Sequence, residues 1–242
     1  MTNTAALDYR GSQMIRFLDE LQITDEPVSP ERFSGRLAEL IDLSQSVKIS
    51  IAHTAMSRME FEPFDNSFDT ARDEVMRVHA DTVDIIVKAF TDHTGSTRLK
   101  APKPERLNNE SQKAAIKPFL SFYAYYQRML DSKLNTLREY IRNSASGLSV
   151  KLAQLAKLDE VLADTLGAHE RKSFAQVPIL LERRFSEQLQ RSQVGQLEEL
   201  HTSFCRDLQA LLLAELEVRM LPVLGLIESI EAEALTQQTI TQ

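Results

Sequence analysis

Two short groups of residues in this 242-residue chain have types that suit metal binding or catalysis. His201 and Cys205 are four residues apart, so a helix would place both on one face, where they would supply two metal ligands. Two ligands do not make a metal site, and Cys205 is more typical of a small core residue. His169, Glu170 and Arg171 lack the second histidine that a zinc-protease motif carries four residues after the first. We expect Glu170 and Arg171 to form surface or interhelical ion pairs.

A third group surrounds His79, with Asp73 and Glu74 before it and Asp81 and Asp84 after it. A di-iron helical bundle requires Glu-x-x-His on paired helices, and that spacing is missing, so we interpret these acids as a solvated helix face. The chain also lacks a glycine-rich phosphate loop, a nucleophile elbow and a dinucleotide fingerprint. The sequence therefore predicts a protein that is not an enzyme, with no catalytic residue, no cofactor and no metal.

Long amphipathic helices are the main signal in the sequence, and they dominate residues 116–190. Apolar residues recur there at spacings of three and four, and two seven-residue repeats together predict one seam that packs helix against helix. The seam consists of Ile116, Tyr123, Leu130 and Leu137 together with Leu120, Gln127, Leu134 and Ile141. We expect Gln127 to be a hydrogen-bonded polar residue that fixes register. Further buried positions are expected at Leu155, Leu162, Leu181 and Phe185.

Helix boundaries follow from capping and breaking residues. Gly147 suits the position after a helix, Ser149 can cap the next one, and Pro178 predicts a kink or a new helix start. The other predicted helices cover residues 5–22, 30–43, 46–59, 68–93 and 196–235.

The predicted fold is therefore all-α, an elongated bundle of about six to eight helices with long antiparallel central helices of coiled-coil type. Proline, glycine and polar residues predict a linker at 95–109. This linker would separate an acidic N-terminal helical region, residues 1–94, from a long-helix bundle, residues 110–235. Residues 236–242 are expected to form a frayed tail.

Composition and charge indicate which environment and which partners are expected. The single cysteine fits a reducing compartment, and no stretch approaches the roughly 18 apolar residues of a membrane span, so we expect a cytoplasmic protein. Net charge is −8 for residues 1–94, +7 for 95–193 and −6 for 194–242. Either the acidic last helix packs beside the basic central helices, or the basic face meets an external anion such as nucleic acid, anionic lipid or an acidic partner helix.

The central part of the chain carries a set of residues with a recognisable spacing: Leu155, Ala156, Leu158, Asp159, Glu170, Arg171, Val177, Pro178, Leu181, Glu182, Arg184 and Phe185. In these residues the chain resembles a proteobacterial family of uncharacterised helical proteins, domain of unknown function 3348. The resemblance implies a small helical cytosolic protein, encoded beside inner-membrane, ion-driven motor-like proteins and OmpA-like proteins. It implies no catalytic residue.

Three classes of function remain. The first is a non-catalytic interaction or adaptor protein that binds a helical partner, plausibly a subunit of a membrane-associated complex; self-association is also compatible with the pattern. Nucleic-acid binding through the basic central helices is the first alternative, although the basic residues there are interleaved with acidic ones. An enzyme whose site forms only in three dimensions is the second. The predicted partner-binding face consists of Phe119, Phe122, Tyr125, Tyr126, Arg183, Arg184 and Arg191.

Overall fold

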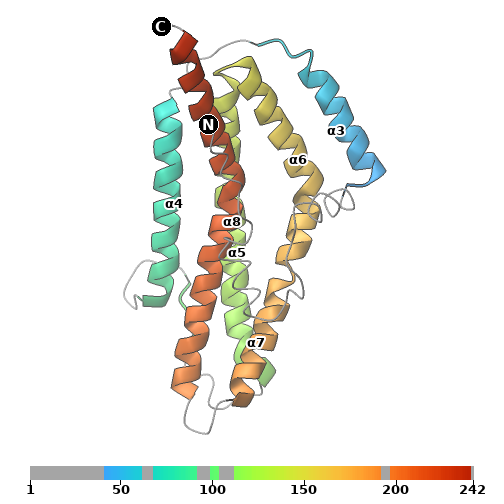
Figure 1. The fold of residues 1–242 in the computed structure, drawn as a ribbon. Helices are drawn as coiled ribbons and strands as arrows, with labels where there is room; N and C mark the ends of the chain where they lie inside the picture. Colours follow the sequence, from blue (N-terminus) through green and yellow to red (C-terminus); the bar gives the residue numbers. More distant parts are fainter. Residues whose placement is uncertain (1–40, 62–67, 92–98, 104–111, 192–196, 241–242) are drawn as a thin grey trace, which may run out of the picture. The chain divides into compact units, whose positions relative to one another are not determined.

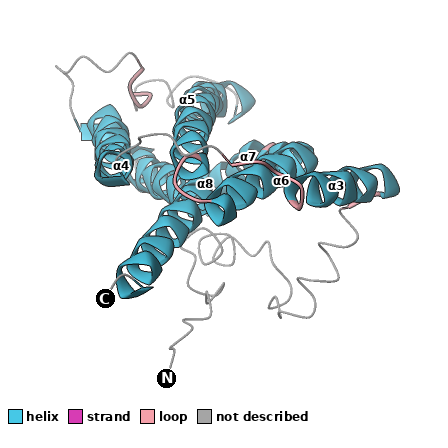
Figure 2. Cartoon of the chain, turned by 90° about the horizontal axis from the view of Figure 1, so that it is seen from above, coloured by secondary structure: helices cyan, strands magenta, loops and turns pink. Residues whose placement is uncertain are grey.

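The structure, a computed structural model, describes residues 41–61, 68–91, 99–103, 112–191 and 197–240 (Figure 1). Within these ranges the chain forms helices and connecting segments but no strand, as Figure 2 shows. The helices are α3 (Leu43–Met56), α4 (Phe68–Thr91), α5 (Gln112–Ser146), α6 (Val150–Phe174), α7 (Val177–Arg191) and α8 (Leu197–Ile240). The all-α prediction is confirmed, and the six described helices lie at the lower end of the predicted number.

The predicted boundaries at Ser149 and Pro178 hold, whereas the helix expected at 46–59 spans Leu43–Met56 and the helix expected to end at 235 continues to Ile240. The Oγ of Ser149 accepts a hydrogen bond from the Leu152 N–H (3.2 Å), so this serine caps α6 as expected. Pro178 is the second residue of α7, where its missing N–H leaves no helical bond unmade. The expected helices at 5–22 and 30–43 lie almost wholly outside the described residues.

The described residues divide into two compact units. The first unit takes them from Asp81–Asp131 and Ser173–Val218, and the second from stretches within Pro30–Ala80, Ser132–Lys172 and Arg219–Gln242. Each unit therefore draws on residues from both sides of the expected linker at 95–109, which differs from the predicted division into regions 1–94 and 110–235. The reason is that α4 and α8, far apart in sequence, each contribute to both units.

Aromatic rings fill the core of the first unit. The ring centroids of Phe119 on α5, Phe185 on α7 and Phe204 on α8 lie 5.1–6.0 Å from one another, two of the three pairs being edge-on. Phe122 packs edge-on against Phe90 of α4 at 5.2 Å. Such pairs add about 0.5–1.5 kcal/mol each beyond the burial of their area.

In the second unit, α3 lies antiparallel to α6 (Figure 1). The side-chain amide of Gln45 donates to the carbonyl of Thr165 (3.1 Å), and that of Gln154 donates to the carbonyl of Met56 (2.9 Å). Asp159 of α6 accepts two hydrogen bonds from the guanidinium of Arg138 on α5, at 2.8 and 2.5 Å. This bidentate, largely buried pair joins α6 to the C-terminal half of α5.

The seam on α5 is confirmed, whereas the predicted burial on α6 is only partly right. Six of the eight seam residues of α5 are buried, and Leu181 and Phe185 of α7 are buried as well. Leu155 and Leu162 are only half-buried. The buried residues of α6 include Leu152, Ala153, Ala156 and Thr165. Small side chains thus occupy much of its closest packing, and Leu155 and Leu162 lie at the edge.

This difference in burial predicts unequal effects of truncation. Leu137→Ala should lower the free energy of unfolding by about 2–5 kcal/mol, because the side chain is buried and leaves a cavity. Leu155→Ala, its matched control in the same unit, should cost markedly less. Urea unfolding followed by circular dichroism measures both losses, and equal losses would show that α6 packs through its leucine stripe after all.

Candidate functional site

Residues 99–103 form an extended segment that three helices of the first unit hold in place. The hydroxyl of Tyr126 on α5 donates to the Leu99 carbonyl (2.8 Å), and the Ala101 N–H donates to the Ala89 carbonyl of α4 (3.0 Å). The third contact joins His201 of α8 to the Pro102 carbonyl, with 2.6 Å between the ring Nε2 and the oxygen. This part of the expected linker is therefore a fixed structural element; the rest of 95–109 lies outside the described residues.

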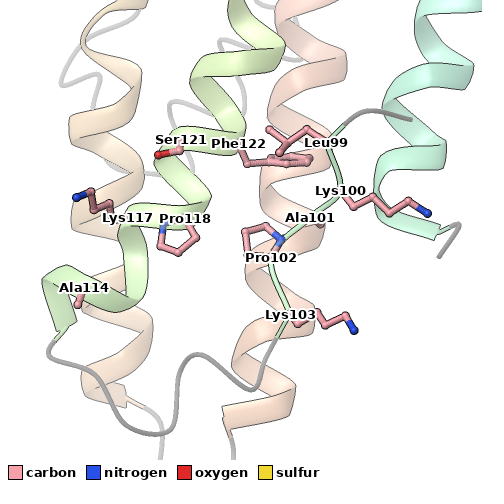
Figure 3. A pocket seen from close by; sticks show the side chains of 10 residues that line it. All are labelled: Leu99, Lys100, Ala101, Pro102, Lys103, Ala114, Lys117, Pro118, Ser121 and Phe122. Carbon is pink, nitrogen blue, oxygen red and sulfur yellow. The ribbon is translucent and has the colours of Figure 1, made fainter. Parts of the chain in front are cut away.

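The segment separates two pockets. The pocket on its α5 side, which we name the lysine groove, has a volume of about 890 Å³ (Figure 3). It is lined by Leu99, Lys100, Ala101, Pro102, Lys103, Ala114, Lys117, Pro118, Ser121 and Phe122. The pocket on the other side, of about 620 Å³, shares Lys100–Lys103 and adds residues of α4 and α8, among them His201, Cys205 and Arg206. Among the described residues, neither pocket is lined by a carboxylate.

The sequence interpretation missed the lysine groove, although one signal for it was present. Pro118 lies well inside α5, where its nitrogen has no hydrogen to donate to the Ala114 carbonyl four residues earlier. Both residues line the groove, which places a backbone acceptor without its helical donor at the groove wall. A proline within a strongly helical pattern indicates a missing helical hydrogen bond at that point. The sequence alone does not predict that residues 99–103 pack against it.

His201 and Cys205 do lie together, with 3.6 Å between Nε2 and Sγ, as their spacing predicted. A carbonyl oxygen only accepts, so the short contact to Pro102 requires that Nε2 carries the proton. This nitrogen then has no lone pair for a metal or for the Cys205 proton. Burial raises the pKa of the Cys205 thiol to about 11, which keeps it protonated near neutral pH. The pair is arranged as packing and as an anchor for the segment.

The four aromatic residues of the predicted partner-binding face do not form a surface. Phe119, Phe122 and Tyr126 are buried among the helices of the first unit, and Tyr125 is half-buried. Burial, and then the neighbouring Tyr125, raise the pKa of Tyr126 to about 12, so its hydroxyl remains a donor to Leu99. The helix α5 carries more aromatic side chains than one seam needs because it packs against several neighbouring helices. These side chains do not form an exposed face.

The three arginines predicted for the same face differ in their surroundings. Arg183 is exposed and pairs with Glu187 on its own helix (3.0 Å), and Arg191 is also exposed. Arg184 instead donates to Asp207 of α8 (3.2 Å), which accepts a second hydrogen bond from Gln188 (3.0 Å). Arg184 therefore joins α7 to α8, and the structure does not bring these arginines into the lysine groove.

A buried polar network crosses the core of the first unit. Glu215 of α8 is fully buried, and its carboxylate accepts a hydrogen bond from the Tyr123 hydroxyl. The Gln127 side chain donates to that hydroxyl (3.4 Å) and to the Phe174 carbonyl at the end of α6 (3.2 Å). Gln127 is thus the hydrogen-bonded polar residue that the sequence predicted. Tyr123, Gln127 and Glu215 line none of the four pockets described among these residues, and we interpret the network as structural.

The remaining candidates from the sequence stay apart. Glu170 pairs with Arg219 of α8 (3.5 Å), an interhelical ion pair as expected, while Glu74 pairs with Arg77 on its own helix (2.5 Å). The hydrogen bond to Arg77 lowers the pKa of Glu74. Across the described ranges, no three histidine, cysteine or acidic side chains converge to hold a metal. Nor does any described helix have the length and apolar character needed to cross a bilayer.

The described residues form an all-α fold with a groove whose described lining carries three lysines and no carboxylate. Residues 2–232 match the model of a family described as "Protein of unknown function (DUF3348)", and the chain therefore belongs to this family. The resemblance noted in the central helices is confirmed at this level and extends over nearly the whole chain. Searches of curated proteins and of solved structures found no match.

The raised thiol pKa predicts slow alkylation of Cys205. Because the pKa rises from 9.0 to about 11, the folded chain holds about 100-fold less thiolate at pH 8 than the unfolded chain. Iodoacetamide should react correspondingly more slowly with native protein than with protein in urea, and this is the only thiol to follow. The native rate should still be rising above pH 9, where the unfolded rate levels off; a native plateau at or below pH 9 would contradict the burial.

The buried network predicts a second stability difference. Tyr123→Phe removes the hydroxyl that donates to the buried Glu215 carboxylate and should cost about 1–3 kcal/mol of unfolding free energy. Tyr125→Phe, two residues along the same helix, is the control and should change stability by less than about 0.5 kcal/mol. If thermal or urea unfolding shows no difference between the two variants, the Glu215 carboxylate is satisfied without Tyr123.

Proposed function

We propose that the protein is a non-catalytic interaction protein that binds another protein at the lysine groove of its first unit. The observation that carries this proposal is the composition of the groove. Among the described residues, its walls are largely apolar, its charged residues are all lysines, and it offers no pair of acid, base or nucleophile. An apolar hollow with a charged rim suits the side chains of a protein segment.

An enzyme is supported less well by the same surroundings. The neighbouring pocket does contain an imidazole and a thiol, but His201 uses its Nε2–H to hold Pro102, and the Cys205 thiol has a pKa of about 11. A nucleophilic cysteine needs a lowered pKa and a base that is free to take its proton. Both requirements fail for this pair.

Nucleic-acid binding also has less support. Several basic residues of the central helices are paired with acids in their own unit: Arg138 with Asp159, Arg184 with Asp207. Proteins that bind single strands stack bases on exposed aromatic rings, and Phe122, the aromatic residue of the groove, is buried.

The family resemblance adds a narrower proposal about the partner. The resemblance implies a cytosolic bacterial protein whose gene lies beside genes for inner-membrane, ion-driven motor-like proteins and OmpA-like proteins. We therefore propose a subunit of such a complex as the partner, with the cytoplasm as the site of action.

Site-specific crosslinking tests the proposed function. Ser121 is exposed at the groove, and Asn135 is equally classed as exposed on the same helix but lies outside it. With p-benzoylphenylalanine at Ser121, irradiation of cells of the source organism should give one reproducible protein adduct that Asn135 does not give. Ser121→Trp should fill the groove and abolish recovery of the same protein, while Asn135→Trp should leave it unchanged. Adducts of equal yield from both positions, or none from Ser121, would refute the proposal.

A further inference from the structure

The lysine groove combines an apolar floor with outward-directed positive charge. Figure 3 shows the rings of Pro102 and Pro118 on facing sides, with Phe122 next to Leu99 at one end. The three lysine side chains do not converge on the hollow: Lys117 points away on one side, and Lys100 and Lys103 on the other.

This arrangement decides which of two kinds of occupant, a small ligand or a longer charged segment, the groove suits better. A small ligand is normally oriented by a few polar groups that converge on it, and here the charged groups diverge from the hollow. Charges on both flanks of an apolar hollow instead match an occupant that is longer than the hollow and carries opposite charge beside its apolar anchors.

The charge around the groove has one sign in a chain whose net charge is −7. Lys103 and Lys117 are exposed and make no ion pair with the described residues. Glu198 and Glu199 of α8 share a separate hollow with Arg206 and do not line the groove. Among the described residues, Lys103 and Lys117 therefore carry positive charge that no carboxylate pairs.

Resting on the proposed function, we propose that the partner docks an acidic amphipathic segment in the lysine groove. Its apolar side chains enter between Pro102 and Pro118, and its carboxylates face Lys117 on one flank and Lys103 on the other. A donor group of the segment would bond to the Ala114 carbonyl, for which Pro118 supplies no N–H. Two exposed lysines beside a short hollow suit a few carboxylates better than the longer run of phosphates that a nucleic acid presents.

A defined pair of probes tests this chemistry on the full chain. The first is a fluorescent helical peptide with leucines at i, i+3, i+4 and i+7 and glutamates on its flanks; the second has glutamine at every glutamate. Fluorescence anisotropy should show at least about tenfold weaker binding of the glutamine probe at low salt, and the acidic probe should weaken as salt rises.

Charge-reversal and groove-filling variants test whether the acidic probe binds at the lysine groove. Lys103→Glu with Lys117→Glu should weaken the acidic probe at least about tenfold and reduce its preference over the neutral probe. Lys48→Glu with Lys172→Glu changes the net charge equally at exposed positions of the second unit and should have little effect. Ser121→Trp should weaken both probes. Unchanged far-ultraviolet circular dichroism confirms that each variant is folded.

Contrary results have distinct meanings. Equal affinity for the two probes, no binding of either, or equal losses from the two charge-reversal pairs would overturn the acidic-segment proposal. The proposed function would survive any of these if the Ser121 crosslink and its loss in Ser121→Trp persist. Tighter, Lys103- and Lys117-dependent binding of a short DNA or RNA than of the acidic peptide would overturn it in favour of a nucleic-acid partner.

Discussion

The first unit depends on a carboxylate that is buried without exposure to water. Glu215 lies in the middle of α8, and burying an ionised group costs several kcal/mol unless hydrogen bonds replace its lost solvation. The Tyr123 hydroxyl contributes one of these bonds, and Gln127 links that hydroxyl to the Phe174 carbonyl at the end of α6. A shift of α5 by one turn would break this network, so these polar residues help to fix the register of the helices.

A fixed register is what allows a short irregular segment to become part of a site. Tyr126 is three residues after Tyr123, and its hydroxyl reaches the Leu99 carbonyl only if α5 is held at the correct height. His201, against the Phe119 ring, makes the equivalent contact to Pro102 from α8. The aromatic residues that looked available for a partner are thus used to position the groove, and recognition is left to the segment and the residues at its rim.

The sequence predicted those features that local pattern determines. The seam on α5, the cap at Ser149 and the helix start at Pro178 each follow from spacing or from one residue's backbone chemistry. The prediction that Leu155 is buried was only partly right, since the side chain is half-buried. Periodicity gives the direction of an apolar stripe but not how closely a neighbouring helix approaches it. The groove was not predictable, since its walls come from residues 99–103 and α5, and composition alone classified residues 95–109 as a linker.

The alternation of charge along the chain is explained in part by pairing inside each unit. In the first unit Asp207 of the acidic last helix forms an ion pair with Arg184, and in the second unit Glu233 forms one with Lys151 (3.6 Å). Such pairs contribute little stability when they are exposed, but they cancel the field of the basic residues involved. Lys103 and Lys117 have no such neighbour among the described carboxylates, so positive potential persists where the apolar hollow opens. Positive charge beside an apolar hollow favours a partner that brings its own carboxylates.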